Sequence, residues 1–306
     1  MSFSLKILGS NSATPAYGRH HTAQVLNVGR HHFLIDCGEG TQERLVKYKV
    51  HTWKINHIFI SHLHGDHYLG LMGFIFTMHL LKRTHDLHIY GQKGLKEIIL
   101  TQLKYSDSRL NYVIVFHELN TKKETVIFED PKITVSSFPL DHRIPCCGFL
   151  FREKKKPFRI NKETLPINIP LKAIAALKQG YDYHDDNTGI LYKQKELTLP
   201  PKKARSYAYC SDTKYNERII PIIKGVDLLY HETTFLKGKE EWANLTFHST
   251  TEEAGNMAKK AGVGKLISGH YSARYKDLTP FLNEVKSIFP NTELSIEGNT
   301  IEVNDE

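Results

Sequence analysis

Ser61-His62-Leu63-His64-Gly65-Asp66-His67 holds three histidines and one aspartate within six residues. The stretch follows an apolar, β-branched run at residues 57–61 that predicts a strand. Alternating histidines would leave the end of that strand on one side, while the aspartate and the last histidine turn in from the following loop. So many nitrogen and oxygen donors are too dense for a packed core or for a chance surface cluster. They predict a metal site; the donors suit zinc, manganese or iron, with zinc the usual ion where histidine dominates.

Three more candidate ligands, His142, Asp212 and His270, lie in loops that directly follow apolar runs. Each is weak evidence by itself, because a lone histidine after a strand usually caps or packs. Strand ends gather at one rim of a sheet, however, and seven donors exceed what one tetrahedral site uses. A carboxylate such as Asp212 can bridge two cations about 3.5–4 Å apart, a spacing that serves displacement at phosphorus. The sequence therefore predicts a centre for two metal ions.

The rest of the chain alternates short strand patterns with longer helical ones. The predicted strands are Ser4–Leu8, Ala23–Val28, His32–Asp36, His57–Ser61, Leu87–Tyr90, Tyr112–Phe116, Lys132–Ser136, Gly148–Phe151, Ser206–Cys210, Asp227–Tyr230, Lys265–Ser268 and Glu293–Glu297. The predicted helices are Tyr68–Lys82, Lys93–Tyr105, Tyr215–Lys224, Thr250–Ala261, which has a capped start, and Leu278–Ile288. This pattern predicts an α/β fold of two packed sheets covered by helices.

Composition limits the class of protein. The 306 residues are 40% hydrophobic and 24% charged, which is ordinary for a globular protein. No apolar run of about 18 residues predicts a membrane helix, and the first ten residues do not resemble a signal peptide. The four cysteines show no C-x-x-C spacing and two are adjacent, which suits reduced thiols. We therefore expect a cytoplasmic protein with no membrane segment.

Positive charge is concentrated between residues 151 and 205. Thirteen Lys and Arg stand there against six acidic residues, a net charge of +7 out of +8 for the whole chain. A solvated insertion and a phosphate-binding surface both fit this segment, because Lys/Arg clustering is only an electrostatic footprint.

The order of the metal motifs, H-x-H-x-D-H and then a single His, Asp and His, resembles the metallo-β-lactamase superfamily over essentially the whole chain. Finer motifs resemble those of the ribonuclease Z family in its short bacterial-type form. These motifs are Asp36-Cys37-Gly38-Glu39-Gly40-Thr41-Gln42, His231-Glu232-Thr233-Thr234-Phe235, His248-Ser249-Thr250, His270-Tyr271-Ser272-Ala273-Arg274-Tyr275 and Pro201-Lys202-Lys203-Ala204-Arg205. The metal ligands alone would not select this family, whereas the combination does.

The resemblance implies a single domain over residues 1–306, an αββα four-layer sandwich with a flexible basic arm inserted at about 151–205. It also implies two zinc ions per chain, and a homodimer in which one subunit's arm holds the substrate for the other's site. One zinc would be held by His62, His64 and His142, the other by Asp66, His67 and His270, with Asp212 bridging. Asp36 would orient a ligand histidine.

The implied activity is removal of the 3′ trailer from precursor tRNA, leaving a 3′-hydroxyl on the tRNA and a 5′-phosphate on the trailer. Asp66 would accept a proton from the attacking water, and His248, supported by Glu232, would protonate the departing 3′-oxygen. Without the resemblance, His248 would be interpreted as a neighbour of a helix cap and Glu232 as part of a buried ion pair. The implied RNA-binding residues are Lys154, Lys155, Lys156 and Arg159 in the arm, and Lys203 and Arg205 in the P-x-K-x-R motif.

Two other functions compete with this one. The same fold could hydrolyse a small phosphodiester, an aryl sulfate or a thioester, because fold does not fix substrate. A small substrate, however, needs neither the basic segment nor the P-x-K-x-R motif. A non-catalytic RNA-binding protein would not need the intact ligands.

The arm departs from the family pattern G-P-L-x-G-x-L-K-x-G. Residues 171–180 keep its Leu-Lys and final Gly but lose the proline and the two earlier glycines.

Overall fold

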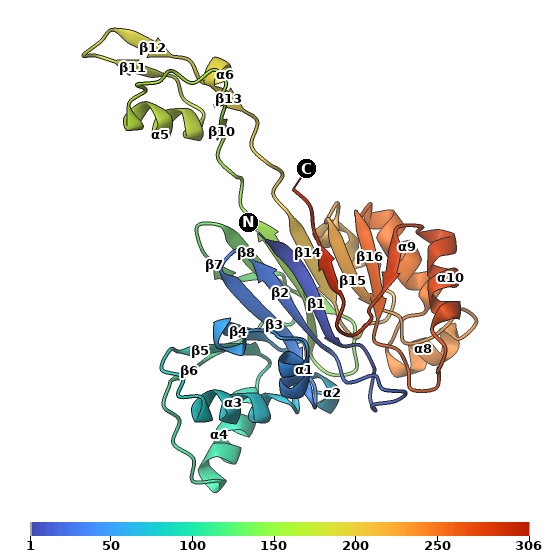
Figure 1. Cartoon of the computed structure of the whole chain (residues 1–306). Coiled ribbons are helices and arrows are strands. Elements are labelled where there is room, and N and C mark those ends of the chain that lie inside the picture. Colours follow the sequence, from blue (N-terminus) through green and yellow to red (C-terminus); the bar gives the residue numbers. More distant parts are fainter. Residues whose placement is uncertain (1, 306) are drawn as a thin grey trace.

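Two seven-stranded sheets lie face to face, with helices on their outer faces, in the computed structural model, which describes residues 2–305 (Figure 1). The first sheet has the order β18-β1-β2-β3-β4-β5-β6 and the second the order β17-β16-β15-β14-β9-β8-β7. The strands of the first sheet are β1 (Phe3–Gly9), β2 (Ala23–Val28), β3 (His31–Cys37), β4 (Ile55–Phe59), β5 (Leu87–Gly91), β6 (Ile114–Glu118) and β18 (Thr300–Glu302). Those of the second are β7 (Thr125–Glu129), β8 (Ile133–Leu140), β9 (Cys146–Glu153), β14 (Ser206–Cys210), β15 (Leu228–Glu232), β16 (Lys265–Gly269) and β17 (Thr292–Leu294).

Alternating side chains of each strand separate the layers. In β3, Phe33 and Ile35 join the core between the two sheets, whereas Leu34 packs under the helices of the first sheet. In β9, Phe151 lies in the same central core, and Leu150 packs toward the helices of the second sheet. This two-residue period is what buries both faces of a sheet. The predicted α/β sandwich is therefore confirmed.

Helices cover each outer face (Figure 1). The helices α1 (Thr41–Lys47), α3 (Leu71–Leu80) and α4 (Leu95–Tyr105) pack on the first sheet, and α7 (Ile220–Ile223), α9 (Thr251–Ala261) and α10 (Thr279–Ile288) pack on the second. The predicted capped start of α9 is present, because Thr250 and Glu253 form a reciprocal capping box. The shorter elements of this body are α2 (Gly65–Tyr68), α8 (Glu240–Thr246), η1 (Thr52–Lys54) and η2 (Glu217–Ile219). No helix among the described residues is long and apolar enough to cross a membrane.

An arm projects from the sandwich between β9 and β14 (Figure 1). Its tip has its own small core of Ala173, Leu177, Tyr192 and Leu197. The elements of the arm are β10 (Arg159–Ile160), α5 (Leu171–Gln179), β11 (Tyr183–Asp185), β12 (Ile190–Tyr192), α6 (Gln194–Leu197) and β13 (Thr198–Leu199). Because β9 continues to Glu153, the arm leaves the sheet slightly later than the boundary at about 151.

Several elements differ from the prediction. The expected helix over 68–82 is divided into α2 and α3, because the backbone at Gly70 packs against the 37–38 turn; an added Cβ at Gly70 would lie 2.1 Å from the Gly38 oxygen. The expected helix over 215–224 shortens to η2 and α7, since Pro221 favours a helix start there. The strands β7 and β18 and the helices α1 and α8 were not expected.

Candidate metal centre

All seven predicted ligands meet at one rim of the sandwich, where strands of both sheets end. The H-x-H-x-D-H motif follows β4, and His142, Asp212 and His270 follow β8, β14 and β16. Their donor atoms form two groups, each with all atoms within 4.8 Å of one another. One group is His62, His64, His142 and Asp212; the other is Asp66, His67 and His270. The structure thus brings the seven predicted ligands together, and a third group of Asp212, His248 and His270 overlaps these two.

In the first group, three ring nitrogens lie close together. His64 Nδ1 lies 3.0 Å from His62 Nε2 and 3.1 Å from His142 Nε2. In the second group, His67 Nε2 and His270 Nε2 each lie 3.4 Å from Asp66 Oδ2. Imidazole nitrogens and a carboxylate oxygen gathered in this way are the donor set that zinc takes in proteins.

Asp212 lies between the two groups, with one oxygen toward each. Its Oδ1 is 3.3 Å from His67 Nε2 and 3.2 Å from His270 Nε2. Its Oδ2 is 3.6 Å from His62 Nε2 and 3.9 Å from His142 Nε2. This is the placement that a bridging carboxylate needs.

The charges of the centre also fit cations. Burial and the neighbouring histidines hold the pKa of His62 well below its usual range, which keeps its nitrogen available as a ligand. Burial opposes a charge on His67 too, but Asp212, Asp66 and Asp36 raise its pKa well above the ordinary value. His67 Nε2 is buried and has no hydrogen-bond partner. A buried nitrogen without a hydrogen-bond partner, beside the carboxylates of Asp66 and Asp212, is the environment that a metal ion would satisfy.

A buried network orients the ligands from behind. Asp36 Oδ2 accepts a hydrogen bond from His67 Nδ1 at 2.7 Å, so that His67 Nε2 faces the centre. Ser61 donates to Asp36 through its backbone nitrogen and its hydroxyl, and the Tyr209 hydroxyl donates to Asp36 at 2.6 Å. Asp36 thus has the position expected from the family motif. Ser61 and Tyr209 were not predicted as site residues: Ser61 stood in the quoted motif and Tyr209 in a predicted strand, but neither type signals metal chemistry.

Half-buried His248 pairs with the fully buried Glu232 beside the centre. His248 Nδ1 lies 2.9 Å from Glu232 Oε1, and burial is outweighed by this carboxylate, which raises the pKa of His248 to about 9. Thr234 joins the pair to the ligands, because its hydroxyl donates to Glu232 Oε2 at 2.7 Å and accepts from His270 Nδ1 at 2.9 Å. Thr234 belongs to the H-E-T-T-F motif, but only the structure shows that its hydroxyl connects Glu232 to His270.

A cavity of about 680 Å³ opens over the two groups of ligands. His248, Asp66 and Asp212 line it together with Arg143 and the loop 12–15. Ala13 in that loop donates its backbone N–H to Asp66 Oδ2 at 2.8 Å. Nothing in the sequence of this loop pointed to the site.

Four of the eight non-glycine residues with positive φ in residues 2–305 belong to this site. Ala13, Asp36, Phe247 and His270 all have φ between 49° and 61°, a left-handed conformation that non-glycine residues rarely adopt. Strain of this kind persists where surrounding contacts over-determine it, commonly at functional sites. The four residues are held by contacts to the ligands or are themselves ligands.

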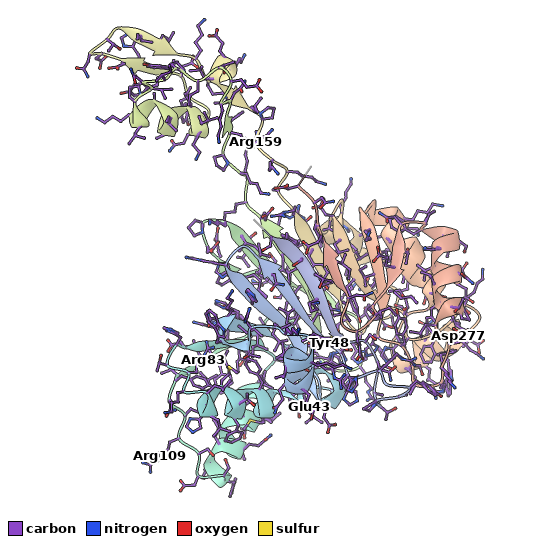
Figure 2. The ribbon with its side chains drawn as sticks, in the orientation of Figure 1. Glu43, Tyr48, Arg83, Arg109, Arg159 and Asp277 are labelled. Atoms are coloured by element: carbon purple, nitrogen blue, oxygen red, sulfur yellow. The ribbon has the colours of Figure 1, made fainter. Side chains whose placement is uncertain are left out.

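The predicted RNA-binding residues lie at the root of the arm, not at the metal rim. Arg205 is 3% exposed and forms an ion pair with Glu153 at 2.8 Å, which ties the two strands from which the arm leaves. This placement favours a structural role for Arg205. Lys203 is paired with Asp227, Lys154 with Glu129, and Lys156 with both Glu153 and Asp305. Lys155 is exposed, and Arg159 lies at the foot of the folded tip (Figure 2).

Comparison with known proteins agrees with this architecture. A family model described as Anti-Pycsar protein Apyc1 matches residues 3–163, which end before Asp212, His248 and His270. The ribonuclease Z of Cytophaga hutchinsonii is 49% identical and covers 100% of this chain and 97% of its own. The ribonuclease Z of Bacteroides fragilis is 44% identical and covers 97% of both chains.

Solved structures show the same fold. Human tRNase Z, short form, superimposes with a TM-score of 0.73 at 25% identity, over 98% of this chain and 99% of that one. The metallo-β-lactamase fold protein YhfI of Bacillus subtilis gives a TM-score of 0.69 at 18% identity over 98% of each chain, a likeness of fold alone. The end-to-end relatives, the fold and the motifs agree: the chain belongs to the ribonuclease Z family, with a metallo-β-lactamase fold.

Proposed function

We propose that this protein is a zinc-dependent endoribonuclease that removes the 3′ trailer from precursor tRNA. The observation that carries the proposal is the His248–Glu232 pair beside two ligand groups that have Asp212 between them. RNA hydrolysis needs a nucleophile, charge relief at phosphorus and a proton for the leaving oxygen. The site offers a separate set of groups for each need.

Different residues would serve the three chemical needs of the reaction. Bound zinc would supply Lewis-acid activation of water and charge relief at the phosphate, held by the seven ligands named above. Asp66 lines the cavity and has the acceptor oxygen for the water's proton. His248 holds a proton at neutral pH because of Glu232, and it faces the same cavity, where it would protonate the departing 3′-oxygen.

The direct test is incubation of purified protein and zinc with a 3′-extended tRNA. We expect a cut at the start of the trailer, a 3′-hydroxyl on the tRNA and a 5′-phosphate on the trailer. Cleavage of a small phosphodiester, aryl sulfate or thioester without cleavage of the tRNA would assign the alternative substrate class instead. We further propose a cytoplasmic location, which the four free, buried cysteines support.

The arm is proposed to bind the body of the tRNA. Replacing Lys154, Lys155 and Lys156 with Ala together should weaken tRNA binding. The slope of the logarithm of the binding constant against the logarithm of the salt concentration should also become shallower, by roughly one unit for each phosphate that the variant no longer contacts. Cleavage of a small nitrophenyl phosphodiester should be unchanged, because these residues lie at the root of the arm. The matched control replaces Lys259 and Lys260 of α9 and Lys265 at the start of β16. Equal loss on both substrates would show that the arm residues are structural.

A homodimer in which the arm acts in trans is also proposed, and the path of β14 supports it. The arm joins before Ser206, whereas Asp212 follows the other end of this five-residue strand, roughly 17 Å away. The arm then projects further from the metal rim (Figure 1). Its tip is therefore directed away from the site of its own chain.

Mixing two defective variants tests the arrangement in trans. One variant lacks residues 160–198. Arg159 and Leu199 are paired in the structure, so a short turn can close this deletion. The other variant is His248→Ala. Neither should cleave tRNA well alone. Random exchange of subunits should restore about a quarter of the wild-type rate, because half the dimers would combine one intact site with the partner's arm. No gain above the sum of the two variants would contradict action in trans.

A further inference from the structure

Phe247 ends α8 in a left-handed conformation, with φ 61° and ψ 47°. The chain uses glycine for nearly the same turn elsewhere: Gly262 follows α9 with φ 62° and ψ 41°. Glycine is the usual residue here because a side chain crowds the backbone in this conformation. A phenylalanine in such a turn implies that its ring makes a contact that offsets the strain.

The backbone of Phe247 holds one candidate metal ligand. Its carbonyl oxygen accepts a hydrogen bond from His142 Nδ1 at 2.9 Å. With Nδ1 engaged in this way, His142 Nε2 keeps its lone pair for the centre and lies 3.1 Å from His64 Nδ1. The orientation of His142 thus depends on the left-handed turn.

The same turn places His248, the next residue. The His248 backbone nitrogen donates to the Ala243 carbonyl at 2.8 Å, which closes the turn on α8. Its ring then reaches Glu232 at 2.9 Å. A change in the turn would therefore move a ligand and the proposed acid together.

The ring of Phe247 is anchored from a third loop. The Lys214 ammonium lies 3.8 Å from the ring centroid, a close cation–π contact. Lys214 stands two residues after Asp212, and its backbone nitrogen donates to the carbonyl of Asp141, the residue before His142, at 2.9 Å. The ring contact thus joins the loops that carry Asp212, His142 and His248.

We infer that Phe247 is a positioning residue: its ring, held under Lys214, fixes the strained turn that aims His142 at the metal centre and keeps His248 on Glu232. The part that concerns His248 rests on the proposed function, whereas the part that concerns His142 does not. This residue acts through its neighbours and need not touch the substrate.

Phe247→Gly is the sharpest test, because glycine keeps the left-handed turn and its carbonyl while it removes the ring. Zinc affinity, measured by competition with a chelator, should fall roughly 10- to 100-fold, as for other residues that orient a ligand. The kcat for a nitrophenyl phosphodiester should fall while KM stays near the wild-type value. Phe247→Tyr keeps the ring face and should restore both, and Lys214→Met should shift both in the direction of Phe247→Gly by less.

Trp242→Ala is the matched control, because it removes an exposed aromatic ring from the same helix that does not line the cavity. It should leave zinc affinity and rate unchanged. Phe247→Gly with wild-type zinc affinity and kcat overturns the inference, and unchanged values in Lys214→Met overturn the anchoring contact. If Phe247→Gly does not fold, as judged by thermal unfolding of the metal-free protein, Phe247→Leu removes the ring face while keeping apolar bulk, and the same readouts decide. The zinc titration uses no RNA, so failure to cleave tRNA would count against the proposed function alone.

Discussion

His248→Ala should slow cleavage of a 3′-extended tRNA by roughly 10²- to 10⁴-fold, the usual worth of general acid catalysis. Metal content and tRNA affinity should stay at wild-type values. His248 lies near Asp212 and His270, but both groups of predicted ligands have at least three donors without it, and it lies at the metal rim, not in the arm. Single-turnover cleavage, elemental analysis and a binding titration measure the three quantities. Glu232→Gln should give a milder loss, since it perturbs the acid without removing it.

A substrate with a better leaving group separates acid catalysis from other roles. A nitrophenyl phosphodiester needs little protonation of its leaving oxygen, so His248→Ala should cleave it at close to the wild-type rate. If that substrate is slowed as much as tRNA, His248 is not the acid and a structural or positioning role replaces it.

The pH dependence gives a further check on the same pair. Glu232 raises the pKa of His248 to about 9, so the acid is protonated below that pH and loses its proton as the pH rises through it. The rate on tRNA should therefore fall on the alkaline side. In Glu232→Gln this alkaline fall in rate should begin at a lower pH, because the carboxylate no longer stabilises the imidazolium of His248.

The sequence could predict that the seven candidate ligands lie together, because each one directly follows a predicted strand or stands in the motif after one. A strand pattern followed at once by His or Asp fixes both the residue and its place at a strand end, and strand ends of a packed sheet share a rim. His142 and Asp212 are 70 positions apart in the chain, and each is weak evidence by itself; their shared position directly after a strand is what connects them. The roles of His248 and Glu232, by contrast, came only from the family resemblance.

What the sequence could not show depends on contacts between distant segments. Tyr209 in the second sheet donates a hydrogen bond to Asp36 in the first, and the sequence around neither residue predicts that contact. Arg205 shows the converse: its motif suggested an exposed cation, but the return of the chain beside Glu153 buries it. The break between α2 and α3 has the same origin, since it depends on the approach of Gly70 to the turn after β3.

Asp212→Asn should have the largest effect of any single substitution in this site. The change keeps the size of the side chain but replaces one oxygen with an amide nitrogen that cannot ligate a metal. In the structure the two oxygens face different groups, Oδ1 toward His67 and His270 and Oδ2 toward His62. The wild type should hold two zinc ions per chain, and Asp212→Asn should lose at least one of them.

The rate on both tRNA and a nitrophenyl phosphodiester should then fall by roughly 10³-fold or more, because a metal ion stabilises the transition state by several kcal/mol. In contrast to His248→Ala, a better leaving group should not rescue the rate of Asp212→Asn. The lost metal ion would activate the water and relieve charge at phosphorus, and both are needed whatever the leaving group. Asp141→Asn is the control, an exposed acid beside the ligand His142 that belongs to neither group of ligands. Asp66→Ala should resemble Asp212→Asn, because it removes a ligand and the proposed proton acceptor together. Wild-type zinc content in Asp212→Asn would show that the two groups of ligands hold their ions independently, and Asp212 would no longer be the bridge.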